Sequence, residues 1–155
     1  MQGNSNIIQT LNDLLAFELA SIDQYFIHSQ MYDNWGYHKL FERIDHERQD
    51  ETGHATLLIA RILFLEGTPN VVQRAPLRLG DTVPTMLAAD LQTEYDVAAA
   101  LKTSIALCER EQDYVTRDIL LKLLDDTERD HAHWLEQQLG LIKAIGLENY
   151  LQSQC

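Results

Sequence analysis

The sequence has few residues that would cross-link the chain or direct it to a membrane. Its two cysteines, Cys108 and Cys155, lie far apart and form no CxxC pair. This argues against a disulfide scaffold or a thiolate metal site and favours a reducing compartment. No stretch approaches the roughly 20 apolar residues of a membrane span, and the first residues lack the basic and apolar pattern of an export signal. We therefore expect a cytoplasmic protein with no membrane partner.

Basic residues are also scarce, since 12 Lys and Arg oppose 24 Asp and Glu and leave a formal charge of -12. A chain with this charge repels a phosphate backbone and attracts cations, so nucleic acid is excluded as a partner. A length of 155 residues predicts one domain, 1–155, which buries roughly two-thirds of the surface of the unfolded chain.

The 3 prolines and 7 glycines are rare and stand mostly where helices should end. Apolar periodicity predicts four long helices, with a short fifth helix after Gly146; the long ones cover about 5–36, 37–66, 82–111 and 113–144. Asn4 or Ser5 and Asp81 or Thr82 are candidate N-caps. The only long connection runs from Gly67 to Thr82. These lengths predict an all-α four-helix bundle with one long crossover.

A glutamate interrupts the inward-facing apolar stripe of each long helix, at Glu18, Glu51, Glu94 and Glu128. For the fourth helix, the stripe is expected to include Leu121 and Leu124. A buried carboxylate without a partner costs several kcal/mol, so four of them in one bundle require cations. The pattern therefore indicates a metal site in the core.

Two of these glutamates begin a Glu-x-x-His motif, which ends at His54 in the second helix and at His131 in the fourth. One glutamate from each of two helices and Glu-x-x-His from each of the other two is the ligand set of di-iron and di-manganese carboxylate proteins. Oxygen-rich ligands with one imidazole per ion suit iron or manganese rather than structural zinc. We predict a di-iron site in which Glu51 and Glu128 bridge the ions; the six ligands are Glu18, Glu51, His54, Glu94, Glu128 and His131.

Over essentially its whole length the chain resembles a bacterioferritin-type subunit. The segments that carry the resemblance are LLAFELASIDQYFIHSQMYDNWG, HERQDETGH, RILFLEGTPN, DTERDHAHWLE and GLENYLQSQ. The resemblance implies a ferritin-like bundle and self-assembly into a hollow shell of twenty-four subunits. It also implies ferroxidase activity, in which Fe(II) is oxidised with O2 or H2O2 at a di-iron centre in each subunit and stored as a ferric mineral.

The resemblance gives roles to further residues. Tyr25 matches a tyrosine that lies beside the di-iron centre and supplies an electron, although a buried tyrosine that only bonds a ligand glutamate fits its position as well. His46 and Asp50 match an inner-surface iron site, with an ordinary His/Asp pair on a solvated helix face as the alternative. Glu47 is a candidate relay for iron. Three other histidines match no ligand position and are expected at the surface or at interfaces, namely His28, His38 and His133.

Thr52 departs from the pattern of bacterioferritins that bind haem, where a methionine stands at this position and two symmetry-related sulfurs ligate one iron. A threonine hydroxyl is a poor ligand for haem iron. We therefore expect no haem in the homo-oligomer, whereas a methionine-bearing paralogous subunit could contribute haem by co-assembly.

Two other functions also fit the sequence. One is a di-iron peroxidase or oxygenase of the rubrerythrin kind without mineral storage, which is weakened because no CxxC pair is present to deliver electrons. The other is an acidic helical interaction module whose glutamates lie at a subunit interface without metal. Iron content and particle size separate these functions from iron storage.

Overall fold

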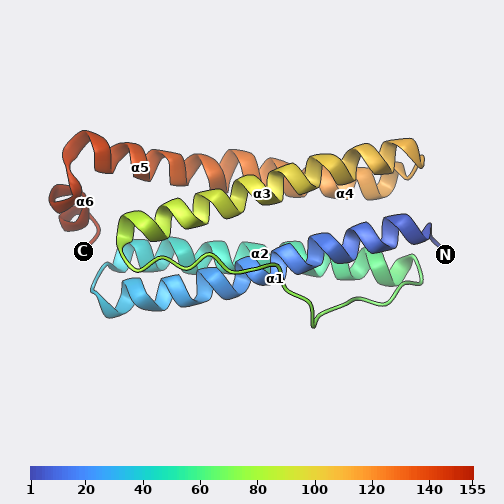
Figure 1. Cartoon of the computed structure of the whole chain (residues 1–155), viewed down its shortest axis with the longest axis horizontal. Coiled ribbons are helices and arrows are strands. Elements are labelled where there is room, and N and C mark those ends of the chain that lie inside the picture. Colours follow the sequence, from blue (N-terminus) through green and yellow to red (C-terminus); the bar gives the residue numbers. More distant parts are fainter.

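The computed structural model describes residues 1–155 and contains helices but no strands. Helices α1 and α2 lie side by side, and α3 lies beside a fourth rod made of α4, the π-helical segment η1 and α5 (Figure 1). The bounds are α1 Ser5–Asn34, α2 His38–Phe64, α3 Val83–Arg110, α4 Tyr114–Asp125, η1 Asp126–Ala132, α5 His133–Ile145 and α6 Leu147–Ser153. The predicted ferritin-like four-helix bundle with a short C-terminal helix is confirmed.

The helices begin where the sequence predicts N-caps. The Asn4 side chain accepts hydrogen bonds from the backbone N–H groups of Asn6 and Ile7, at 2.7 and 3.3 Å. Thr82 and Thr85 form a capping box at the start of α3. Both contacts satisfy N–H groups that have no partner within the helix.

The connection between α2 and α3 runs along most of the length of the bundle (Figure 1). It returns the chain to the end where α1 stops, so α3 runs antiparallel to α1. The middle of α1 consequently faces the middle of α3 and brings Tyr25 to Glu94. This topology places the mid-helix glutamates at one level of the bundle.

Two apolar clusters occupy the two halves of the core, with the metal-ligand candidates between them along each helix. One cluster contains 13 buried residues, including Leu15, Leu58 and Val97. The other contains 9 and includes Ile44 and Leu135. Apolar packing above and below the polar level excludes water and fixes the helices that carry its side chains.

The fourth rod differs from the uninterrupted α-helix that the sequence predicts, because η1 is π-helical. Leu121, predicted in the core, is 43% exposed, and Leu124 is only partly buried, whereas Leu120, Leu123 and Thr127 are buried. A π-helical turn bonds i to i+5 and holds more residues than an α-helical turn. The residues before η1 are therefore rotated relative to His131, so the prediction is wrong for Leu121, whereas Leu124 packs against the edge of the core.

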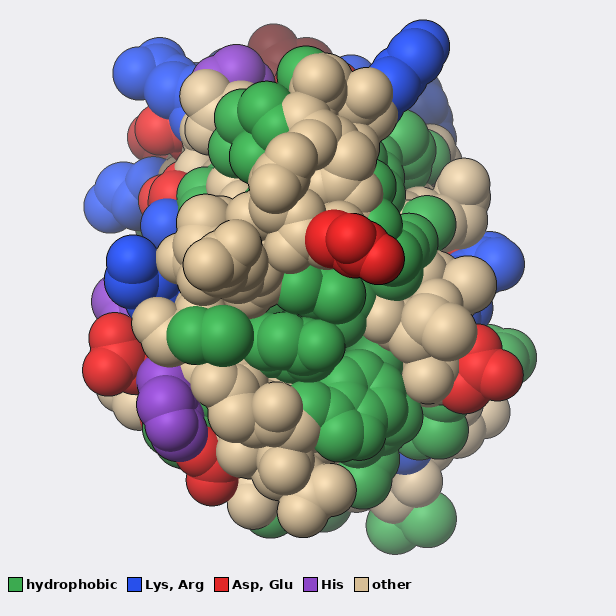
Figure 2. Space-filling model, turned by 90° about the vertical axis from the view of Figure 1, so that its left-hand side faces the viewer, with side chains coloured by type: hydrophobic (Ala, Val, Ile, Leu, Met, Phe, Trp, Pro, Cys, Tyr) green, Lys and Arg blue, Asp and Glu red, His purple; other side chains and the backbone are tan.

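Helix α6 closes one end of the bundle. Tyr150 is buried, and its hydroxyl donates a hydrogen bond to Gln138 Oε1 at 2.8 Å. Viewed from this end, hydrophobic side chains gather in the middle of the face and charged ones lie mainly around them (Figure 2). No helix in the chain combines the length and the apolar character needed to cross a membrane.

Candidate metal centre

Five of the six predicted ligands lie together in the core, and all five are buried. Their candidate ligand atoms form two groups, each within 4.8 Å: Glu18, Glu51 and His54, and Glu51, Glu94 and His131. The three long α-helices and η1 each supply at least one of these side chains. The bundle thus assembles at mid-height two adjacent sites that have Glu51 in common.

Glu51 faces both histidines with different oxygens. Its Oε2 lies 3.4 Å from His54 Nδ1, and its Oε1 lies 2.9 Å from His131 Nδ1. The two imidazole rings are nearly parallel, with an interplanar angle of 19° and 5.8 Å between their centroids. One carboxylate therefore spans two sites of the same composition.

Each site is completed by one further carboxylate. Glu18 Oε2 lies 3.5 Å from His54 Nδ1, and Glu94 Oε1 lies 3.5 Å from His131 Nδ1. Both oxygens of Glu18 and the Nδ1 atoms of both histidines are buried without an aligned hydrogen bond. An unmatched buried polar atom costs about 1–3 kcal/mol, so these atoms are suited to holding cations.

The ionisation of the cluster reflects its crowding. Burial and the charge of Glu51 raise the pKa of Glu94 to about 7. Burial also raises the pKa of Glu18, with Glu51 acting in the same direction. Burial alone would lower the pKa of His54, but Glu18 and Glu51 outweigh it and raise that pKa to about 11. In the absence of metal, protons on the histidines thus balance part of the carboxylate charge.

The second nitrogen of each histidine faces another carboxylate. His54 Nε2 lies 3.0 Å from Asp126 Oδ2, and His131 Nε2 lies 3.3 Å from Asp50 Oδ2 and 2.7 Å from Glu47 Oε2. A histidine that ligates a metal through one nitrogen commonly donates its other N–H to a carboxylate, which fixes the ring and its tautomer. Both Nδ1 atoms are therefore oriented toward the shared Glu51, as metal ligation requires.

Glu128 is the one predicted ligand that the structure does not bring to the cluster. Its side chain is 49% exposed and pairs with Lys102 Nζ at 3.6 Å. The Glu-x-x-His spacing places both side chains on one face of an α-helix, but the wider turn of η1 rotates Glu128 away from His131. Asp126, which no sequence motif marks, lies five residues before His131 and reaches His54 instead. A spacing of five would have indicated it, had the π-helical turn been expected.

Tyr25 occupies the predicted place beside the cluster. It is buried, and its hydroxyl donates a hydrogen bond to Glu94 Oε1. Burial and the neighbouring charge of Glu94 raise the pKa of Tyr25 well above its ordinary value. The tyrosine is therefore a neutral phenol in contact with a candidate ligand.

Comparison with known proteins places this cluster in a family context. A family model described as a ferritin-like domain matches residues 8–145. The chain belongs to the ferritin family. It is 62% identical to a bacterial ferritin of Synechocystis and 59% identical to one of Pseudomonas aeruginosa, with 99% of each chain covered in both comparisons. It is also 41% identical to a bacterioferritin of Brucella melitensis over 98% of this chain and 94% of the relative. Membership of this family makes the protein an iron-storage protein.

In this ferritin, His46 and Asp50 lie at the edge of the cluster. His46 is 59% exposed, and its Nε2 lies 3.4 Å from Asp50 Oδ2, the same oxygen that faces His131. An open groove of about 520 Å³ runs beside Asp50 and reaches His54; it is lined by Gln49, Asp50, Gly53, His54, Leu57, Asp126 and Asp130. An acidic surface therefore connects solvent with the buried cluster.

Thr52 lies on the exposed side of α2 of the ferritin chain. Its hydroxyl donates a hydrogen bond to the backbone carbonyl of Arg48 at 3.0 Å. The hydroxyl thus bonds its own helix, as threonines in helices commonly do.

Proposed function

We propose that this ferritin oxidises Fe(II) at a di-iron ferroxidase centre within each subunit and stores the product as ferric mineral inside a hollow shell. In this proposal the whole chain, 1–155, acts as one ferritin-like di-iron domain. The observation that carries it is Glu51, whose two oxygens face two buried histidines in adjacent sites of equal composition. A symmetric pair of oxygen-rich sites suits two Fe(II) ions held close together.

The paired sites allow a two-electron reaction. Two Fe(II) ions give one electron each and, with two protons, reduce O2 to H2O2 or H2O2 to two water molecules. The protein supplies position and charge: Glu18 and His54 serve one ion, Glu94 and His131 the other, and Glu51 serves both. Glu47, Asp50 and Asp126 hold the histidine rings through their Nε2 atoms.

Two further roles extend the proposal. Tyr25 supplies an additional electron, and Glu94 is placed to accept the phenolic proton that leaves with it. His46 and Asp50 pass iron or electrons between the centre and the shell interior. Asp50 supports this role because its Oδ2 faces both His46 and the buried His131.

The proposed particle is a shell of twenty-four subunits, and its homo-oligomer lacks the bis-thioether haem site of bacterioferritins. Symmetry places the same residue on both sides of a two-fold axis, so Thr52 removes both sulfur ligands at once. A methionine-bearing paralogous subunit could restore haem by co-assembly. Exposed apolar surface at the α6 end supports contacts between subunits (Figure 2).

Iron loading under air tests the proposed function. The purified protein should form a particle of twenty-four chains of 17.8 kDa each. It should retain far more than two iron ions per chain after repeated additions of Fe(II). Light scattering gives the particle mass, and iron analysis after gel filtration gives the load. A monomer or dimer that keeps only two iron ions per chain would instead favour the rubrerythrin-like alternative.

A second test separates Asp126 from Glu128. Asp126→Ala should weaken binding of Co(II), a substitute for Fe(II) that is stable in air, by about 10–100-fold, because His54 loses the carboxylate that orients it. Asp125→Ala is the matched control, since Asp125 pairs only with the exposed Arg129. Isothermal titration measures both affinities.

The same titration examines the role that the sequence predicts for Glu128. As a ligand, Glu128 must leave Lys102 and turn inward when metal binds, and Glu128→Ala should then weaken Co(II) binding as strongly as Glu51→Ala. Wild-type affinity in Glu128→Ala would remove Glu128 from the ligand set.

A further inference from the structure

A second buried polar cluster lies next to the metal centre, between α1, α3 and the crossover. Its core is His28 and Asp90, both fully buried, together with Gln24, which is almost fully buried. The sequence alone predicts His28 at the surface or at an interface, and that prediction is wrong, because the ring is fully buried within the chain. A buried histidine and a buried carboxylate that bond each other hold two helices together in the core.

The hydrogen bonds of this cluster define the state of His28. Its Nδ1 lies 2.8 Å from Asp90 Oδ1, and its Nε2 lies 3.2 Å from the backbone nitrogen of Gly80. A backbone N–H can only donate, so Nε2 is the acceptor and carries no proton. His28 is therefore a neutral imidazole that donates its Nδ1–H to Asp90, and one ring links α3 to the crossover.

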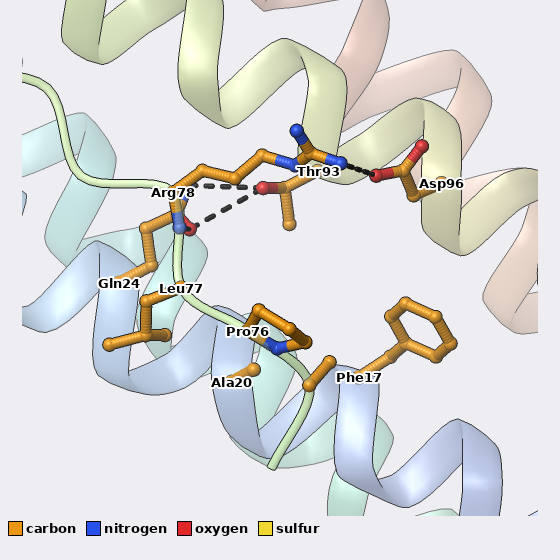
Figure 3. Close-up of a pocket in the computed structure, with 9 residues that line it drawn as sticks. Phe17, Ala20, Gln24, Pro76, Leu77, Arg78, Thr93 and Asp96 are labelled. Atoms are coloured by element: carbon orange, nitrogen blue, oxygen red, sulfur yellow. Dashed lines mark hydrogen bonds and ion pairs between the residues drawn. The ribbon is translucent and has the colours of Figure 1, made fainter.

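Gln24 makes the same link one turn earlier on α1. Its Nε2 donates to Asp90 Oδ1 at 2.8 Å, and its Oε1 accepts from the backbone N–H of Arg78 at 2.9 Å. Figure 3 shows Gln24 reaching Arg78 at the edge of a cavity of about 270 Å³ under the crossover. Gln24 and His28 of α1 thus both bond the Asp90 carboxylate of α3, and each also accepts one backbone N–H of the crossover.

The His28–Asp90 contact and the Tyr25–Glu94 contact at the metal centre join the same two helices, α1 and α3. Tyr25 follows Gln24 and lies about one turn before His28 on α1, and Asp90 lies about one turn before Glu94 on α3. Because the two helices are antiparallel, the Tyr25–Glu94 contact and the His28–Asp90 contact lie one turn apart. A change in the spacing at one contact is transmitted to the other through two rigid helices.

The crossover approaches α3 closely at this point. A side-chain carbon at Gly80 would lie 2.4 Å from the backbone nitrogen of Met86, so only glycine fits there. The other side-chain bonds that hold this connection are mostly solvent-exposed, such as those of Asn70 and Arg74. The bonds to Arg78 and Gly80 are part-buried and are therefore better protected than these, and a backbone bond from Ala75 N–H to the Ala16 carbonyl also holds the connection.

We propose that His28 and Asp90 are positioning residues: His28 Nε2 holds the end of the crossover, and His28 Nδ1 holds Asp90 and so keeps α1 and α3 spaced for the Tyr25–Glu94 contact. The proposal rests on the function given above only in that Glu94 serves the iron centre. It assigns to the His28 ring two separate tasks, one for each nitrogen.

Two substitutions separate these tasks. In His28→Asn the side-chain amide can replace Nδ1 as donor to Asp90 but leaves Gly80 without an acceptor. In His28→Gln the longer amide can replace Nε2 as acceptor for Gly80 but no longer serves Asp90. His133→Asn is the matched control, because His133 is exposed and makes no side-chain hydrogen bond.

Hydrogen exchange on the metal-free oligomer tests the crossover task. In His28→Asn, the amide of Gly80 should exchange about tenfold faster than in wild type, whereas in His28→Gln it should stay near the wild-type rate. The amide of Arg78, which bonds Gln24, serves as the internal reference. Unchanged exchange at Gly80 in His28→Asn would overturn the proposed attachment of the crossover. This measurement needs no iron, so its result stands even if the proposed ferroxidase activity fails.

Co(II) titration of the same proteins tests the other task, in which His28 Nδ1 holds Asp90 and keeps Glu94 in position. His28→Gln should weaken Co(II) binding about tenfold, and His28→Asn should rescue most of that loss. Equal affinities in wild type and His28→Gln would refute the positioning of Glu94. Equal losses in His28→Asn and His28→Gln would also refute it, because general destabilisation does not distinguish the two nitrogens. A wild-type protein that binds no Co(II) would reject the metal centre, with the exchange result unaffected.

Discussion

Glu51→Ala should reduce the initial rate of Fe(II) oxidation by about 100-fold or more. Glu51 is the only side chain shared by the two fully buried groups, so in the proposed centre its loss removes a ligand from each ion and the charge that holds the pair together. Loss of either neighbouring ligand alone would leave one site complete. Stopped-flow absorbance of the ferric product measures the initial phase.

Glu42→Ala is the control for that result. Glu42 is exposed on the same helix and forms no ion pair, so its variant loses a carboxylate of the same length and should oxidise Fe(II) at the wild-type rate. Circular dichroism should find both variants folded, because the apolar clusters on either side of the centre are unchanged. Fast oxidation in Glu51→Ala would falsify the assignment of the centre.

The affinity of the metal-free protein for Co(II) should fall steeply as the pH is lowered from 8 to 6. The pKa of His54 is raised to about 11, and that of His131 is also raised by Glu47, Glu51 and Glu94 against the effect of burial. Both histidines therefore hold protons at neutral pH, and a metal must displace them. Each displaced proton lowers the affinity about tenfold for each pH unit of acidification, so two protons lower it about 100-fold per pH unit.

Glu94 should make the affinity for Co(II) depend more steeply on pH below pH 7. Its raised pKa of about 7 means that it is protonated below that pH and must then also lose a proton when metal binds. Replacing Glu94 with Gln should weaken binding and remove this added steepness. Calorimetry in buffers of different ionisation enthalpy counts the protons released. An affinity that is constant between pH 6 and 8 would contradict the pairing of protonated histidines with buried carboxylates.

The motif on the second helix could be found from sequence, whereas its counterpart on the fourth could be found only in part. Glu51 and His54 lie in a regular α-helix, so a spacing of three places them on one face. Glu128 and His131 have the same spacing, but η1 separates their directions. Nothing in the residue types of this segment indicates a π-helical turn, and a prediction based on the α-helical period turns Glu128 inward.

The His28 cluster was missed for a different reason. Its partner Asp90 lies 62 positions away, and its other contact is a backbone N–H of the crossover. Sequence spacing relates side chains within one helix and carries no information on which backbone group a long connection presents to a neighbouring helix. A histidine that fits no local motif therefore looked like a surface residue.

The sequence by itself determined the long helices apart from the π-helical turn, their caps, the crossover and the mid-helix position of three buried carboxylates, Glu18, Glu51 and Glu94, because these follow from local periodicity and backbone chemistry. The tertiary structure decided which oxygen of Glu51 faces which histidine, that Asp126 rather than Glu128 contacts His54, and that His28 joins the crossover to Asp90. These depend on the rotation of each helix about its axis and on the path of the crossover. Both are set by packing among all the helices at once, which no single segment specifies.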